Sequence, residues 1–273
     1  MNFLIEIFSH SFMIRALVVG VAISLVSALV GVTVVLRKNS MIGDGLSHTA
    51  FGAFAIATVL GIAPLWFSIP VVSVVSFFVL HFSKNKKNNG DAMVALLSAS
   101  SLAIGVVAIS VSKGINIDLN SYLFGSILSV SKADVYISLF LSVITTIFYI
   151  FTHNHIFAIS FDEDFAKAIG IKTEIYDGFF AIICSAVVVL GMKLLGALLI
   201  SSLIIFPSLI SMQFSKSFKK VVIFASLISV ANFVAGLVVS YLLSTPTGAT
   251  IVLVNLFVLI ITKLLQSFLR ATS

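Results

Sequence analysis

Asp44 and His48 lie four residues apart inside an apolar stretch of this 273-residue chain. On an α-helix, side chains at positions i and i+4 share one face, so a carboxylate and an imidazole would stand one above the other. An oxygen and a nitrogen ligand of these types suit a divalent ion such as Zn²⁺ or Mn²⁺. Ionisable side chains within membrane helices are costly and usually functional. We therefore predict a metal half-site here; the alternative is a hydrogen-bonded structural pair that joins two helices.

The elements that must position this pair are expected to be membrane helices. Only 10% of the residues are charged and the mean hydropathy is +1.21, whereas soluble domains carry roughly 25% charged residues. Strict alternation of polar and apolar residues is absent, which argues against a membrane barrel. We predict an all-α polytopic protein, one domain over residues 1–273, with about nine transmembrane helices or, alternatively, eight. The apolar runs cover about 14–36, 45–63, 64–82, 92–112, 133–152, 175–192, 194–213, 221–243 and 249–269.

The positive charges predict an orientation. With the N-terminus outside, basic residues concentrate in the inner loops, as the positive-inside rule requires, and the C-terminus is inside. The outer side keeps Arg15, Lys113, Lys132 and Lys193, and the inner side has the other twelve of the 16: Arg37, Lys38, Lys84, Lys86, Lys87, Lys167, Lys172, Lys216, Lys219, Lys220, Lys263 and Arg270. Since these clusters separate apolar runs, they indicate orientation rather than nucleic-acid binding.

Lys38 would then mark the inner surface. A helix that rises 1.5 Å per residue from Lys38 would place Asp44 at about 9 Å and His48 at about 15 Å, close to the bilayer midplane. Substrate sites of transporters tend to lie at that depth. Gly43, Gly45 and Gly52 flank the pair, and glycines let neighbouring helix backbones approach closely.

Two segments between the runs are unusual. The inner segment 152–172 has acidic residues followed by helical spacing and a glycine, which predicts a short amphipathic helix on the inner face. Its alternatives are a solvated connector and a docking helix for another subunit. The outer segment 114–133 mixes polar and apolar residues and suggests a re-entrant or interfacial segment, with Tyr122 at headgroup level.

Other polar residues are weaker candidates for chemistry. His10, His81, His153 and His155 are expected near the ends of spans. Outer acidic residues could attract cations or belong to an ordinary solvated loop, namely Asp118 and Asp134. Glu174 and Asp177 are expected to stabilise a helix N-terminus.

Five motifs in the same order resemble the ABC-type zinc/manganese/iron uptake permease family. The match covers nearly the whole chain and rests on these motifs: Ile42-Gly43-Asp44-Gly45-Leu46-Ser47-His48, Ser121-Tyr122-Leu123-Phe124-Gly125, Phe161-Asp162 through Gly170, Gly196-Ala197-Leu198-Leu199 to Pro207, and Thr247-Gly248-Ala249-Thr250. The resemblance implies the membrane subunit of a transporter in a bacterial cytoplasmic membrane. It also implies a homodimer, two cytoplasmic ATPase subunits and an extracytoplasmic metal-binding protein.

The resemblance assigns roles to residues as well. The Asp-x-x-x-His pair matches the family's metal site, which transfers to Asp44 and His48. The inner segment matches the ATPase-contacting region, which transfers to Asp162, Glu163, Asp164, Phe165, Ala166, Ile169 and Gly170. The Ser-Tyr-Leu-Phe-Gly motif and Gly52 favour a zinc-type member over a manganese/iron-type one. The metal is expected as cargo, with no permanently bound cofactor.

The function predicted from the sequence is that of a permease subunit of an ATP-driven divalent metal importer, most consistent with Zn²⁺. No G-x-x-x-x-G-K-[ST] phosphate loop occurs, so a separate subunit is expected to hydrolyse ATP and the chain itself is not an enzyme. The alternatives are a manganese/iron permease and an autonomous proton-coupled metal transporter. An intramembrane metalloenzyme is disfavoured because no H-E-x-x-H motif occurs.

Overall fold

The structure, a computed structural model, describes residues 11–83, 90–112, 125 and 130–272. All regular structure in these residues is helical, as expected where backbone groups must be hydrogen-bonded within hydrocarbon. The helices are α2 (Ser11–Leu36), α3 (Ile42–Val59), α4 (Pro64–Ser83), α5 (Gly90–Val111), α7 (Lys132–Phe161), α8 (Glu163–Ala168), α9 (Thr173–Leu195), α10 (Ala197–Phe214), α11 (Phe218–Leu243) and α12 (Thr247–Thr272). The predicted all-α polytopic class is confirmed.

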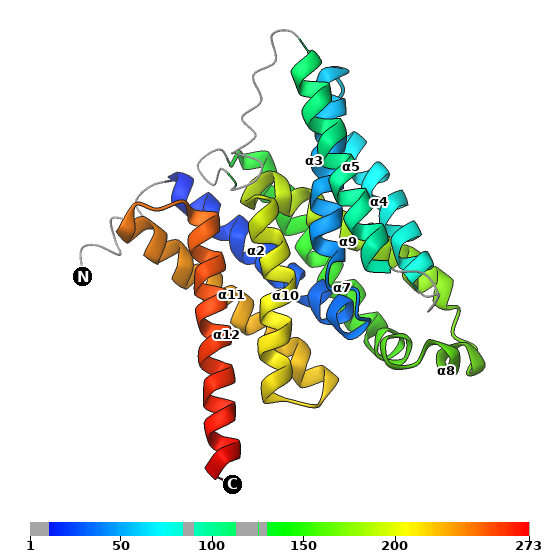
Figure 1. Cartoon of the computed structure of the whole chain (residues 1–273), viewed down its shortest axis with the longest axis vertical. Coiled ribbons are helices and arrows are strands. Elements are labelled where there is room, and N and C mark those ends of the chain that lie inside the picture. The colour runs from blue at the N-terminus through cyan, green and yellow to red at the C-terminus, as the bar shows by residue number, and fades with distance from the viewer. Residues whose placement is uncertain (1–10, 84–89, 113–124, 126–129, 273) are drawn as a thin grey trace.

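The long helices form two groups joined by α2 and α9 (Figure 1). Helices α3, α4 and α5 pack together on one side, and α10, α11 and α12 pack together on the other. Helix α2 contacts α7, α10 and α11, and α9 contacts α3, α4 and α10. Among the eight most apolar helices, these two connecting helices are the most buried, with 78% and 67% of the residues in their apolar windows buried. The core therefore follows α2 and α9.

Within the described residues, eight helices are long and apolar enough to cross a membrane. The ninth expected span corresponds to α3, which has 18 residues and includes Asp44 and His48. Its polar residues lower its mean hydropathy, yet most of its residues are buried against other helices. Helix α3 is thus shielded by protein along most of its length.

Small residues bring α3 close to its neighbours. A Cβ atom on Gly52 would lie 2.6 Å from the Ser101 carbonyl oxygen of α5, and one on Gly45 would lie 2.5 Å from Val94. A Cβ on Gly43 would lie 3.1 Å from Ile204 of α10. The predicted close approach of a neighbouring backbone is confirmed at Gly52, whereas Gly43 and Gly45 lie closest to the side chains of Ile204 and Val94.

Helix boundaries differ from the apolar runs mainly at the C-terminal end of α7. The run ends at about 152, whereas the helix continues to Phe161. Ile156 and Ile159 are buried in the extra turns, and Phe157 packs on Phe218 with ring centroids 5.4 Å apart. The continuation is stabilised by contacts with α11 that are distant in sequence and so leave no local apolar run.

An ion pair holds the turn between α2 and α3 against the start of α9. Arg37 donates to the Asp177 carboxylate at 2.6 Å, with the side chains 11% and 4% exposed. The guanidinium also lies 5.4 Å from the Phe180 ring centroid. Asp177 does lie near the helix N-terminus, as expected, but its partner is a residue 140 positions away.

We predict that replacing Gly52 with leucine destabilises the fold. The added side chain has to displace the α5 backbone at Ser101, and overpacking of this kind costs about 1–3 kcal/mol. Thermal unfolding of the purified chain in detergent should show a lower Tm. Gly178→Ala is the control, since nothing lies within 4 Å of a Cβ there. An unchanged Tm in Gly52→Leu would contradict the described packing.

We predict that Arg37→Met costs more stability than Arg37→Met combined with Asp177→Leu. Replacing Arg37 alone leaves the Asp177 carboxylate buried without a partner, which lowers the free energy of unfolding by about 3 kcal/mol or more. Replacing both residues leaves no unpaired buried charge, so the loss of stability is smaller. A double-mutant cycle on Tm measures the coupling. Purely additive effects of the two substitutions would show that the pair does not stabilise this junction.

Candidate functional site

Asp44 and His48 lie on the first two turns of α3. The Asp44 Oδ1 and His48 Nε2 atoms are 3.6 Å apart, which is longer than a normal hydrogen bond. Two ligand atoms about 2.1 Å from one tetrahedral ion would be about 3.4 Å apart. The spacing of the two side chains therefore suits a shared divalent ion better than a direct hydrogen bond.

The two side chains differ in exposure. The Asp44 side chain is 52% exposed in the single chain and that of His48 is 20% exposed. The second ring nitrogen of His48, Nδ1, is buried and has no hydrogen-bond partner among the described residues. The imidazole is thus not committed to a structural hydrogen bond through either nitrogen.

The prediction that one helix rises without interruption from Lys38 to Asp44 and His48 is wrong. Residues 37–41 form a turn, with a positive φ of 58° at Lys38, and α3 begins only at Ile42. Counted from the first residue of α3, Asp44 rises about 3 Å and His48 about 9 Å. The depth of the pair in a bilayer stays a prediction. Asp44 in the first turn also benefits from the positive end of the helix.

By itself the pair could supply only two ligands to a metal ion. No cluster of three or more His, Cys, Asp or Glu residues exists in the part of the chain that the structure describes. A tetrahedral zinc site needs four ligands, so two would have to come from elsewhere.

The remaining described histidines contact aromatic rings instead of carboxylates. His153 lies 4.9 Å from the Phe218 ring, His155 stacks on Tyr176 at 4.8 Å, and His81 stacks on Phe77 at 6.0 Å between ring centroids. These positions fit structural roles at the ends of spans. His10 lies outside the described residues.

The predicted short helix is present as α8, between α7 and α9, while its position on the inner face stays a prediction. The Asp162 side chain caps it by accepting a hydrogen bond from the Phe165 backbone N–H at 2.9 Å. Lys167 forms an ion pair with Glu163 at 2.9 Å, which raises the pKa of the lysine. Gly170 has a φ of 87°, which favours glycine, and ends the helix.

The predicted docking residues therefore divide into two kinds. Phe165 and Ile169 present apolar side chains that are 57% and 56% exposed, and the acidic residues lie around the first turn. Ala166, by contrast, is fully buried. Its position shows that α8 is fixed to the rest of the chain, while its opposite face is open.

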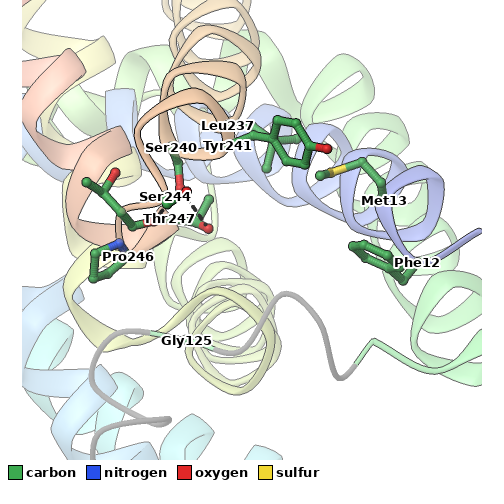
Figure 2. Close-up of a pocket in the computed structure, with 10 residues that line it drawn as sticks. Phe12, Met13, Gly125, Leu237, Ser240, Tyr241, Ser244, Pro246 and Thr247 are labelled. Carbon is green, nitrogen blue, oxygen red and sulfur yellow. Dashed lines mark hydrogen bonds between the residues drawn. The ribbon is translucent and has the colours of Figure 1, made fainter. Parts of the chain in front are cut away.

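At the other end of the molecule, a pocket of about 670 Å³ lies between α2 and the turn from α11 to α12 (Figure 2). Phe12 and Met13 lie on one side, and Ser240, Tyr241 and Thr247 on the other. The Ser240 hydroxyl donates to the Thr245 carbonyl at 2.6 Å. The Thr247-Gly248-Ala249-Thr250 motif, whose role sequence reasoning did not identify, begins at the rim of this pocket.

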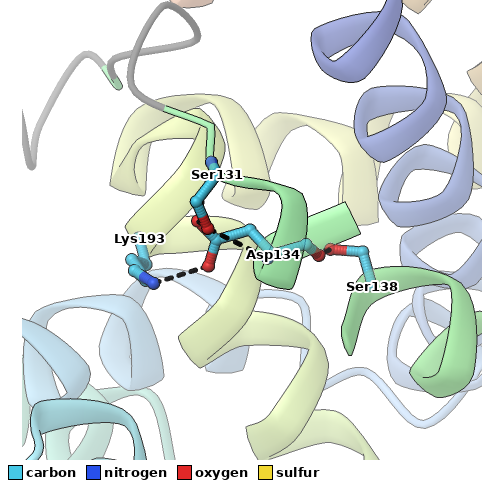
Figure 3. A network of polar contacts seen from close by, with 4 residues as sticks. All are labelled: Ser131, Asp134, Ser138 and Lys193. Carbon is cyan, nitrogen blue, oxygen red and sulfur yellow. Dashed lines mark hydrogen bonds and ion pairs between the residues drawn. The ribbon is translucent and has the colours of Figure 1, made fainter. Parts of the chain in front are cut away.

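Asp134 belongs to a structural network rather than to a solvated loop or a cation-attracting vestibule (Figure 3). Its carboxylate accepts hydrogen bonds from Lys193 at 2.7 Å and from the Ser131 hydroxyl at 2.7 Å. The Ser131 hydroxyl in turn accepts from the Asp134 backbone N–H, which forms a capping box at the start of α7. Asp118 lies outside the described residues, as does most of the predicted re-entrant segment, including Tyr122.

Gly125 lies inside that segment and is described. A Cβ on Gly125, which has a φ of 80°, would lie 2.3 Å from the Leu195 carbonyl oxygen, at the junction of α9 and α10. The junction itself is Gly196, with a φ of 94°. Two of the five motifs thus meet at a pair of glycines, which the sequence order alone did not reveal.

Comparison with known proteins places these features in one family. The ABC 3 transport family matches residues 9–266. A probable metal transport system membrane protein of Treponema pallidum is 32% identical over 263 residues, covering 96% of this chain and 98% of its own. The manganese import system permease protein ScaB of Streptococcus gordonii is 28% identical (92% and 90% covered). The high-affinity zinc uptake system membrane protein ZnuB of Haemophilus influenzae is 27% identical (90% and 94% covered).

A solved structure has the same architecture. PsaBC from Streptococcus pneumoniae in complex with a Fab matches with a TM-score of 0.87 and 25% identity, covering 100% of this chain and 99% of the other. This chain therefore belongs to the ABC 3 transport family and is one of the ABC-type metal uptake permeases that its motifs predicted.

Proposed function

We propose that this chain is the membrane-spanning permease subunit of an ATP-driven importer of a divalent metal, with Zn²⁺ as its cargo. The observation that carries the proposal is the spacing of 3.6 Å between a carboxylate oxygen and an imidazole nitrogen on a shielded helix. Asp44 and His48 hold the ion transiently and offset part of its dehydration cost. The zinc uptake relative supports this cargo. The manganese relative supports Mn²⁺ as the second candidate, since oxygen and nitrogen ligands accommodate both ions.

The exposure of Asp44 supports a homodimer. A carboxylate that is half exposed in one chain would be costly against lipid, so it should face a second copy or a water-filled path. The second copy, water or a ligand from the extracytoplasmic metal-binding protein would supply the missing metal ligands. The second copy or water would also give His48 Nδ1 a hydrogen-bond partner. Metal-bound histidines usually have such a partner on the second nitrogen.

The proposed transport cycle has three steps. An extracytoplasmic metal-binding protein delivers the ion at the outer face, with the N-terminus of the permease outside and its C-terminus inside. The ion then rests at Asp44 and His48. Closure of two cytoplasmic ATPase subunits moves α8, and α9 passes the movement to α3 through their packing and through the Arg37–Asp177 pair. The path then opens inward, in a bacterial cytoplasmic membrane.

We predict that Asp44→Asn and His48→Ala each lower metal uptake about tenfold or more in proteoliposomes containing the assembled transporter. Removing a residue that only hydrogen-bonds to a metal ligand already lowers metal affinity or activity 10–100-fold, so loss of a ligand itself should lower it at least as much. Asp91→Asn is the matched control, because it also removes an exposed carboxylate from the first turn of a span. Zinc and manganese uptake are measured in parallel.

The outcomes separate the two parts of this proposal. Full uptake in both Asp44→Asn and His48→Ala would eliminate the metal site. If the parent chain takes up manganese faster than zinc and both variants lose this uptake, the metal site is supported and the cargo is Mn²⁺ instead of Zn²⁺.

We predict that Phe165→Ser combined with Ile169→Ser releases the ATPase subunits. Both side chains are exposed, so the permease should fold normally while the apolar contact is lost. Co-purification with the tagged permease measures retention of the ATPase. Phe214→Ser is the control, since Phe214 is 58% exposed at the end of α10. Undiminished co-purification of the ATPase with the double variant would refute docking through α8.

A further inference from the structure

A groove between α7 and α11 has no role in the proposed transport path. Both helices pack on α2, and the groove of about 490 Å³ lies between them, with Leu29 of α2 at its base. Its walls have exposed apolar side chains: Ile150 is 69% exposed, Phe151 81% and Ile223 48%. A slot of this shape fits a hydrocarbon chain.

One end of the groove is basic and polar. His153 and Asn154 of α7 and Lys219 of α11 line it together. The groove closes beside them, where the His153 and Phe218 rings lie 4.9 Å apart. Polar groups therefore gather at one end of an apolar slot, as a headgroup and its acyl chain would require.

The charge at this end is not neutralised nearby. Lys219 and Lys220 both lie in the first turn of α11, which contains no acidic residue. Among the residues that the structure describes, no carboxylate forms an ion pair with either lysine. The positive end of the helix adds to the same potential. Because Lys219 lines the groove and Lys220 does not, Lys219 would be the main stabilising charge for an anion bound there.

The length of α7 places the basic end at headgroup level. The 22 helical rises from the N-cap Ser131 to His153 span about 33 Å, close to the hydrocarbon thickness of roughly 30 Å. The last eight residues of α7, from 154 to 161, continue beyond that level towards α8. In the proposed orientation, His153 and Lys219 lie in the cytoplasmic leaflet.

We infer that this groove binds one anionic phospholipid of the cytoplasmic leaflet. Lys219, His153 and Asn154 hold its phosphate, and one acyl chain lies along Ile150, Phe151 and Ile223. A free phosphate would leave the apolar walls uncovered, and a zwitterionic lipid brings its own cation to the lysine. The inference depends on the proposed orientation but not on the metal site.

The test uses lipid quenching of a tryptophan in the groove. The chain has one tryptophan, Trp66, so Trp66→Phe combined with Phe151→Trp leaves a single reporter. Quenching by brominated phosphatidylglycerol is compared with quenching by brominated phosphatidylcholine in vesicles of the two lipids. A lysine near an anionic lipid contributes about 1 kcal/mol of binding free energy, which corresponds to about fivefold stronger quenching by brominated phosphatidylglycerol. In Lys219→Gln, the two lipids should quench about equally.

Lys216→Gln is the matched control, because it removes an exposed lysine three residues earlier, outside the groove, and should keep the preference. Equal quenching by both lipids in the parent, or a preference that survives Lys219→Gln, would overturn the inference. Absence of quenching by either lipid would mean that protein covers the groove and would also overturn it.

Two further measurements distinguish a bound lipid from a bound phosphate ion and from loose contact with the bilayer. Inorganic phosphate added at constant ionic strength should leave the preference unchanged; its loss would assign the site to free phosphate instead. Native mass spectrometry of the chain with Trp66 and Phe151 intact should show one retained phosphatidylglycerol that Lys219→Gln loses, and equal retention would contradict the site. Failure of the Asp44 and His48 uptake predictions would leave both results unaffected.

Discussion

The cost of ionisable groups in hydrocarbon constrains the whole arrangement around α3. A helix with Asp44 and His48 cannot face lipid over its length, and three glycines on it allow the shielding helices to approach closely. Helices α4, α5, α9 and α10 all pack against it. These four helices come from different parts of the sequence, and the remaining helices keep them packed against α3.

Two ion pairs fix α9, which links the two groups of helices. Near its start, Asp177 binds Arg37 of the α2–α3 turn; near its end, Lys193 binds Asp134 at the start of α7. Asp177 and Lys193 also interact favourably with the dipole of α9, since an acidic residue is stabilised near a helix N-terminus and a basic one near the C-terminus. Helix α9 is therefore tied to its neighbours at both ends, and a displacement of α8, directly before it in the chain, would reach α3 through a short path.

Sequence reasoning predicted the features that depend on local patterns. Apolar runs identified the long helices, and the acidic start and Gly170 identified α8, because capping and hydropathy are properties of neighbouring residues. It could not predict the Arg37–Asp177 and Asp134–Lys193 pairs, whose partners are 140 and 59 residues apart. It also misjudged the rise to Asp44, since hydropathy does not reveal that the chain turns at 37–41 before α3 begins. The meeting of Gly125 with the α9–α10 junction is likewise a tertiary contact.

If Asp44 and His48 form the proposed metal site, its incompleteness is what transport demands. A closed structural zinc site binds its ion by about 10–16 kcal/mol, and each 1.4 kcal/mol of affinity lengthens the residence time about tenfold at a constant association rate. A site with two protein ligands from one chain leaves the others to groups that can change when the path opens. In the proposed cycle, a ligand that exchanges its partners needs an open side, which fits the half-exposed Asp44. The mostly covered His48, one helix turn later, would be the fixed ligand.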